Sequence, residues 1–144
     1  MHAFPGRCRS LGLLVLVLLA AGCDGGEGSL APVRGTVFYR GAPLQRGTIV
    51  FTPDALRGSD GSLARADIQP DGTYRLQTGE SHGAALGWHR VTIVAQEDVP
   101  APAADHSFVI PRSLLPDKYR DPELSGLTCE IKAGQENVID FHLE

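Results

Sequence analysis

The chain has 144 residues, 17 acidic and 13 basic side chains, a formal net charge of −4 and 42% hydrophobic residues. This length suits one domain with a modest core. The acidic balance, without a block of five or more basic residues, disfavours nucleic-acid binding and electrostatic adhesion to anionic lipid.

The N-terminal stretch has the pattern of an export signal. Arg7 and Arg9 precede Leu11–Ala21, an apolar run shorter than the roughly 20 residues that span a bilayer. A buried core helix is the disfavoured alternative, because the run lies at the extreme N-terminus. The sequence AAGC at residues 20–23 resembles the lipobox of bacterial lipoproteins. That resemblance implies cleavage before Cys23, lipidation of its thiol and an essentially permanent membrane tether.

One detail departs from the lipobox pattern, and it leaves an alternative open. Leu most often stands three positions before the cysteine, whereas here Leu19 stands four before it. Ordinary cleavage nearby would leave Cys23 as a free thiol. Cys8 leaves with the signal, so Cys129 has no partner for an internal disulfide once Cys23 is lipidated. The strand-like setting of Cys129, TCEI, favours a small core residue over a reactive thiol.

We therefore expect a signal peptide at 1–22, a lipidated flexible tether at 23–31 and one β domain at 32–144. The Gly-rich tether has a reach of roughly 15 Å by the random-coil estimate. Short runs of β-branched and aromatic residues, separated by turn signals, predict an all-β sandwich. The expected strands are Val33–Tyr39, Thr48–Phe51, Leu63–Ile68, Thr73–Leu76, Gly87–Ala95, Thr128–Lys132 and Val138–Leu143.

Several local details of these strands are also predicted. The turn Gln69–Gly72 should let Thr73–Leu76 pair back on the preceding strand. The Gly- and Ala-rich segment Thr78–Leu86 is expected to be a loop. In Gly87–Ala95 one face carries His89, Val91, Ile93 and Ala95, and Trp88 on the other face is assigned to the core.

The segment Gln96–Leu127 is unusual because it has five prolines and no periodicity. Such long connections are usually functional or disordered, so we expect recognition by this loop, with Ala101–Asp105 as a disordered tip. Ser113–Tyr119 is a candidate for one helical turn. In the last strand, Ile139, Phe141 and Leu143 should face inward, and Asp140 and His142 outward.

A family resemblance covers most of the mature chain. It is carried by VRGTVFYRGAPLQRGTIVF, ADIQPDGTYRL, GAALGWHRVTIVA and LLPDKYRDPELSGLTCEIKAGQENVIDFHL. Their order resembles the carboxypeptidase regulatory-like, transthyretin-like domains of small bacterial envelope lipoproteins. The resemblance implies a seven-stranded prealbumin-like β-sandwich. It implies no known activity, and the peptidase activity in the family's name belongs to a different domain.

No catalytic set is predicted. Gly79–Gly83 matches G-x-S-x-G, but a nucleophile elbow needs a strand-to-helix turn in a larger α/β sheet. Asp60-Gly61 and Asp71-Gly72 are interpreted as hairpin turns, not calcium loops. The histidines lack zinc-peptidase spacing, so no metal site is expected; those considered are His82, His89, His106 and His142. Stacking on glycans would have to use Trp88, Tyr74 or Tyr119.

These observations predict a lipid-anchored, non-enzymatic β-sandwich on the extracytoplasmic side of a cell-envelope membrane, acting as a binding or structural module. Its expected modification is lipidation of Cys23, without a cofactor. Its expected partners are the membrane, through the lipid, and an envelope protein or glycan. The alternatives are a carbohydrate-binding accessory, an envelope enzyme whose pocket is not visible in the sequence, and an assembly subunit that pairs through a sheet edge.

Overall fold

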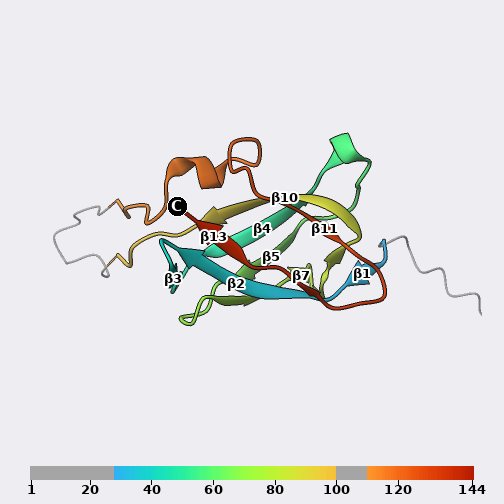
Figure 1. Cartoon of the computed structure of the whole chain (residues 1–144), viewed down its shortest axis with the longest axis horizontal. Helices are drawn as coiled ribbons and strands as arrows, with labels where there is room; N and C mark the ends of the chain where they lie inside the picture. Colours follow the sequence, from blue (N-terminus) through green and yellow to red (C-terminus); the bar gives the residue numbers. More distant parts are fainter. Residues whose placement is uncertain (1–27, 100–109) are drawn as a thin grey trace, which may run out of the picture.

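Short, alternating apolar segments build two packed sheets in the computed structural model, which describes residues 28–99 and 110–144 (Figure 1). The described part is all-β, with two single turns of 3-10 helix as its helical elements. Within these ranges no helix has the length and apolar character that crossing a membrane requires. The predicted signal peptide, Cys23 and most of the predicted tether lie outside the described residues.

The larger sheet is antiparallel, and β10 is the second of its six strands. The strand order is β11-β10-β4-β5-β7-β8. The strands are β4 (Thr48–Pro53), β5 (Ala64–Asp67), β7 (Gln77–Thr78), β8 (Ser81–His82), β10 (Gly87–Val94) and β11 (Thr128–Ile131). The inward face of β10 is fully buried at His89, Val91 and Ile93, which confirms the predicted alternation.

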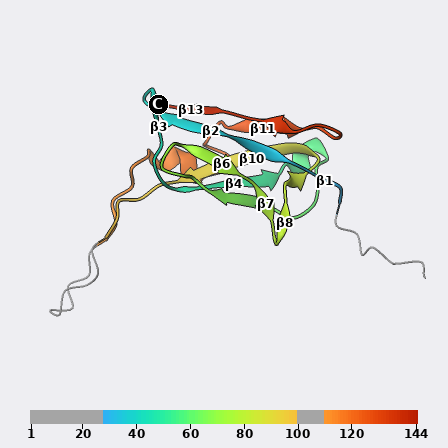
Figure 2. The same cartoon turned by 90° about the horizontal axis from the view of Figure 1, so that it is seen from below.

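The smaller sheet is built around β2 (Val33–Tyr39), whose bounds match the prediction. On one side β2 pairs in parallel with β12 (Asn137–Val138) and β13 (Phe141–Leu143). On the other side it pairs antiparallel with β3 (Ala42–Pro43) and β6 (Thr73–Arg75). Figure 2 shows this sheet lying over the larger one.

The core fills the space between the two sheets. Phe51 of β4 lies at its centre, with ring centroids 6.1 Å from Tyr74 of β6 and 6.0 Å from Phe141 of β13. Phe141 and Leu143 are buried and Ile139 is partly buried, whereas Asp140 and His142 are exposed, as predicted. Contacts from both sheets therefore hold the layers together.

The predicted partner of Thr73–Leu76 is wrong. The turn at Gln69–Gly72 forms as expected, closed by a 2.8 Å bond from Gly72 N to Gln69 O. However, β6 pairs with β2, and only the following β7 returns to β5. The turn sequence specifies a reversal but not a sheet, and here Gly72 O accepts a bond from Val37 N of β2. The chain therefore passes from one sheet to the other and back.

The segment Thr78–Leu86 is not the predicted loop. It contains β8 and then β9 (Ala84–Ala85), which pairs with β1 (Leu30–Ala31). Alanine and glycine are weak strand formers, but close backbone packing favours them here, since a Cβ on Gly83 would lie 2.4 Å from Ala31 O. Strand β1 also includes Leu30 and Ala31, which lie in the predicted tether at 23–31.

The long proline-rich segment is ordered where it is described. Its two limbs pair through a bridge between Gln96 and Ser113, and Glu97 N donates to Arg112 O. The helical turn predicted at Ser113–Tyr119 is η2 (Asp117–Arg120), which starts four residues later. The expected tip, 101–105, lies outside the described residues.

The outer face of β10 is less covered than predicted. Trp88 is partly exposed rather than part of the core, and the Arg57 guanidinium lies 4.3 Å from its ring centroid. An aromatic ring can be partly shielded by a cation instead of by a second apolar layer. Arg57 ends the short helix η1 (Ala55–Arg57).

Candidate functional site

A polar cleft of about 600 Å³ lies beside the outer face of the smaller sheet, and Ala66, Asp67 and Gln77 of the larger sheet also line it. We call it the arginine cleft and define it by Arg34 and Thr36 of β2, Thr73 and Arg75 of β6, and Asp140. Neither Ser, Cys nor His lines it. The cleft therefore offers charged and hydroxyl groups for binding.

The register of β2 and β6 places like side chains next to each other. Arg34 lies opposite Arg75, and Thr36 lies opposite Thr73. In a strand, alternate residues point to the same face, so the two arginines and two threonines form one outward-facing group. The inward residues between them, Gly35 and Tyr74, support this group from below.

Asp140 reaches the cleft because the predicted strand Val138–Leu143 is interrupted. Strands β12 and β13 keep one register along β2, but Ile139 and Asp140 lie between them. There the Asp140 carboxylate accepts the Thr36 backbone N–H at 2.7 Å. The Ile139 carbonyl turns inward, where the Tyr74 hydroxyl donates to it at 2.7 Å. The Asp140 side-chain oxygen thus takes the place of a backbone carbonyl as the acceptor for the Thr36 N–H.

The charges of the cleft are mixed. Arg34 Nε lies 2.9 Å from Glu136 Oε1, and this hydrogen bond raises the pKa of Arg34 and lowers the pKa of Glu136. Both side chains are nearly half exposed, so solvent screens the pair. Among the described residues Arg75 has no ion pair within 4 Å, although its charge also lowers the pKa of Glu136. Arg75 is therefore available to a ligand.

This arrangement suits an anionic group that also carries hydroxyl or amide functions. Guanidinium groups bind carboxylate or phosphate through paired donors. Thr36 and Thr73 can donate or accept hydrogen bonds, and Asp140 accepts them. The strands hold these side chains in place, so little order has to be created on binding.

The G-x-S-x-G segment has no catalytic geometry. Gly79 and Glu80 form the turn of the β7–β8 hairpin, in which Thr78 pairs with Ser81. Ser81 is exposed, and β9 rather than a helix follows it. A nucleophile elbow requires a strand-to-helix turn, so the interpretation as an ordinary glycine-rich segment is supported.

The described histidines lie on different elements and have different neighbours. His82 is 3.5 Å from Gln77 on the β7–β8 hairpin, and His142 stacks on Phe38 at 4.8 Å between ring centroids. His106 lies outside the described residues. Within 28–99 and 110–144, no three or more His, Cys, Asp or Glu side chains gather as a metal site would need.

His89 is the exceptional one, because it lies in the core. Its Nδ1 is 3.0 Å from Gly87 O, and a carbonyl can only accept, so Nδ1 donates. Nε2 then remains as an acceptor, and it is the buried side-chain polar atom without a partner among the described residues. Burial lowers the pKa of His89, and the bond to Gly87 opposes this effect.

We expect the free energy of unfolding to fall as the pH drops below about 6.5, the ordinary pKa of histidine. Because burial lowers the pKa of His89 in the folded state, the unfolded chain takes up the proton first. The loss should continue down to the lower pKa of the folded state.

Urea unfolding at about pH 7.5 and about pH 5.5 measures this loss, with His89→Phe as the matched variant. In His89→Phe the part of the pH dependence that comes from this imidazole should disappear. An identical pH dependence in both proteins would contradict the assignment.

Two further sequence-based interpretations concern turns and the free cysteine. Cys129 is half-buried against the core opposite His89, and burial raises the pKa of its thiol to about 12, as suits a packing residue. The Asp71 carboxylate accepts hydrogen bonds within its own turn, from Thr73 N at 3.0 Å and Thr73 Oγ1 at 2.6 Å. Asp60-Gly61 is not a tight hairpin turn; it lies in the longer loop that follows η1.

Glycan stacking has little support from the predicted rings. Tyr74 and Tyr119 are buried, 1% and 4% exposed, and Trp88 is covered by Arg57. None of Arg34, Arg75 and Asp140 was predicted as a site residue, although Asp140 was expected to face outward. Their outward positions in the strands were readable from the alternation, but their proximity depends on the pairing of β6 with β2.

Comparisons with known proteins add one similarity. No family model matches the chain, and no solved structure matches it. Over 99 residues it is 32% identical to a urease accessory protein, UreE, of Albidiferax ferrireducens. The aligned stretch covers 67% of this chain and 57% of that protein, so the chain spans little more than half of the relative it matches.

Proposed function

We propose that the chain is a lipid-anchored, non-enzymatic β-sandwich of a bacterial cell envelope and that it binds an anionic ligand or partner in the arginine cleft. The side-by-side placement of Arg34 and Arg75 carries the binding part of the proposal. The apolar run Leu11–Ala21 and the lipobox-like AAGC support the anchor.

The proposal includes the seven-stranded prealbumin-like fold that the sequence resemblance implies. Each of the seven predicted strand ranges contains all or most of one described strand. The division of these strands between two packed sheets supports this fold.

Membrane fractionation of Cys23→Ser tests the anchor. If the Cys23 thiol carries the lipid, wild-type protein should enter the detergent phase and Cys23→Ser should leave the membrane. Retention of the variant in the detergent phase would contradict lipidation at Cys23.

Mild-detergent capture of the lipidated protein from its own envelope, followed by mass spectrometry, tests the cleft. A bound molecule with carboxylate or phosphate groups should be lost from Arg34→Ala/Arg75→Ala and kept by Arg65→Ala. Arg65 is an exposed arginine of the other sheet and serves as the matched control. Equal retention by both variants, or no specific molecule at all, would contradict binding in the cleft.

A third variant addresses the long loop, where the sequence analysis expected recognition. Replacing residues 98–111 by a short turn keeps the pairing of Gln96 with Ser113. Loss of the bound molecule from this variant, but not from the arginine variant, would move the site to the loop. An enzyme among the captured proteins would instead indicate an accessory role, which the name of the UreE relative states for that protein.

A further inference from the structure

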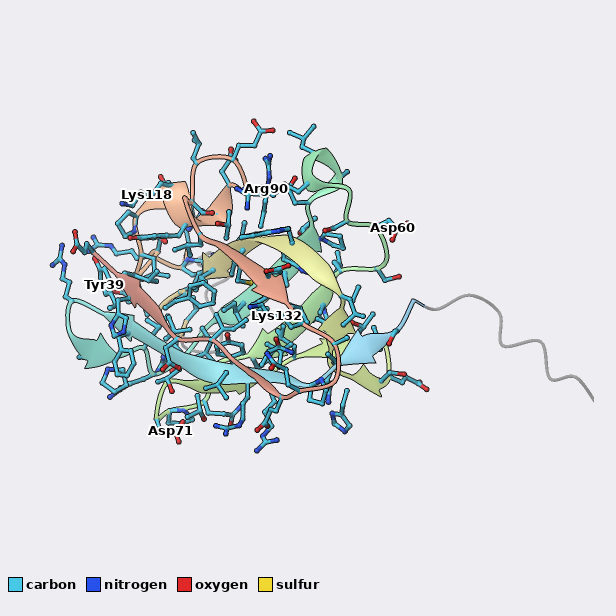
Figure 3. All side chains as sticks on the ribbon, turned by 45° about the vertical axis from the view of Figure 1, so that its right-hand side comes forward. Tyr39, Asp60, Asp71, Arg90, Lys118 and Lys132 are labelled. Carbon is cyan, nitrogen blue, oxygen red and sulfur yellow. The ribbon has the colours of Figure 1, made fainter. Side chains whose placement is uncertain are left out.

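Two exposed leucines lie in the two loops that flank a second hollow, and of the two only Leu56 lines it. Leu56 lies in η1 and is 86% exposed; Leu124 lies in the loop before β11 and is 66% exposed. The hollow between the η1 turn and the 122–126 loop has a volume of about 350 Å³. Figure 3 shows the two loops rising on either side of Arg90.

Hydrogen-bonded turns fix the backbone at both leucines. Asp54 Oδ1 accepts the Leu56 N–H at 3.2 Å. Asp121 Oδ1 accepts the backbone N–H of Glu123 at 2.7 Å and of Leu124 at 3.3 Å. Because these hydrogen bonds hold the backbone in place, the exposure of the leucines does not come from a freely moving loop end.

Arg57 and Arg90 line the same hollow as Leu56. The buried Asp54 carboxylate lies 3.3 Å from Arg90 Nε and 3.5 Å from Arg57 Nε, and Arg57 lies over the Trp88 ring. Exposed leucine near arginine and tryptophan is the combination of residue types that suits a bilayer surface, where apolar side chains enter the acyl region and amphipathic ones stay at the headgroups. Glu123, 3.7 Å from Arg90, offsets part of the positive charge.

The same end of the molecule lies next to the N-terminal strand. A Cβ on Gly61, in the loop that follows η1, would lie 3.2 Å from Ala85 Cβ, and Ala85 pairs with Leu30 of β1. Asp24–Ser29 separates Cys23 from Leu30, and these few residues reach at most about 22 Å when fully extended. A lipid on Cys23 would therefore keep this end within reach of the bilayer.

We propose that Leu56 and Leu124 insert into the surface of the bilayer that holds the lipid anchor, with Trp88, Arg57 and Arg90 at headgroup level. This inference rests on the proposed function, because the lipid on Cys23 supplies the proximity. The contact is mainly apolar, so it should be insensitive to salt. No residue lines both this hollow and the arginine cleft, so the cleft stays accessible in this orientation.

Trp88 is the single tryptophan of the chain and lies at the proposed contact, so it reports on the contact without a label. The experiment uses the lipidated full chain in phosphatidylethanolamine–phosphatidylglycerol vesicles with brominated acyl chains. Bromine should quench Trp88 in the wild type and should quench it several-fold less in Leu56→Glu/Leu124→Glu. Ile110→Glu is the matched control, because Ile110 is also 86% exposed. The limb that begins at residue 110 lies at the opposite end of the molecule from β1 (Figure 1).

Flotation of the same vesicles distinguishes the leucine contact from the lipid anchor. Wild-type protein that floats with the vesicles but shows no bromine quenching would overturn the leucine contact and leave the anchor standing. Equal quenching in the wild type and in Leu56→Glu/Leu124→Glu would overturn the role of the leucines. Failure of the wild type to float would overturn both, and shielding of Trp88 only after addition of an envelope extract would assign the surface to a protein partner.

Discussion

Gly35→Ala should destabilise the fold by about 3 kcal/mol or more, since overpacking a tight site forces the backbone to move. A Cβ at residue 35 would lie 1.7 Å from the Ile139 carbonyl oxygen and 2.6 Å from its carbon. Both are backbone atoms, so no side-chain rotation relieves the clash. The carbonyl is also held by the Tyr74 hydroxyl at 2.7 Å. Chemical denaturation of the variant measures the loss.

Gly41→Ala is the control that separates steric from conformational effects. Gly41 has φ +82°, but no atom lies within 4 Å of its added Cβ. Its substitution should therefore cost only about 1 kcal/mol, from the left-handed backbone. If Gly35→Ala loses no more stability than Gly41→Ala, this would contradict the close approach of Ile139 to Gly35 where the strand is interrupted between β12 and β13.

Asn137→Ala should lower the free energy of unfolding by about 2–3 kcal/mol, because it leaves several buried backbone groups unpaired. Asn137 is only 5% exposed, and its side chain lies at the centre of the last turn. Its Oδ1 accepts the Lys132 N–H at 2.9 Å, and its Nδ2 donates to Lys132 O at 3.1 Å and Gln135 O at 3.3 Å. Denaturant unfolding of the variant measures this effect.

Two further variants define what the amide does. Asn137→Asp keeps the shape and the acceptor but places a carboxylate against the carbonyls of Lys132 and Gln135, so it should be at least as destabilising. Gln135→Ala changes an exposed side chain of the same turn and should stay within about 0.5 kcal/mol of the wild type. Stability of Asn137→Ala close to that of Gln135→Ala would show that the amide network contributes little.

The elements of the fold were largely predictable, whereas their partners were not. Val33–Tyr39 and Gly87–Ala95 alternate apolar and polar residues, and β2 and β10 lie there. The turn at Gln69–Gly72 was equally readable from Pro70 and Gly72. The sheet that Thr73–Leu76 joins was not readable, because a turn sequence carries no information about the strand to which the chain returns.

The candidate site follows from that missing information. Arg34 and Arg75 are 41 positions apart in the sequence and become neighbours only through the pairing of β2 with β6. Asp140 joins them because the last strand is interrupted beside Gly35, where strand propensity alone predicts a continuous strand. His89 Nε2 lacks a partner among the described residues, and this too is a consequence of packing between the sheets.

By itself, the sequence determined the positions of the longer strands, the inward faces of β10 and β13 and the packing role of Cys129. These properties depend on residues one to four positions apart, whose alternation and turn chemistry act locally. Only the tertiary structure decided which strands pair, where Trp88 lies and which charged side chains meet in a cleft. Those outcomes depend on how apolar faces from distant segments bury one another, and this long-range choice leaves no local pattern in the chain.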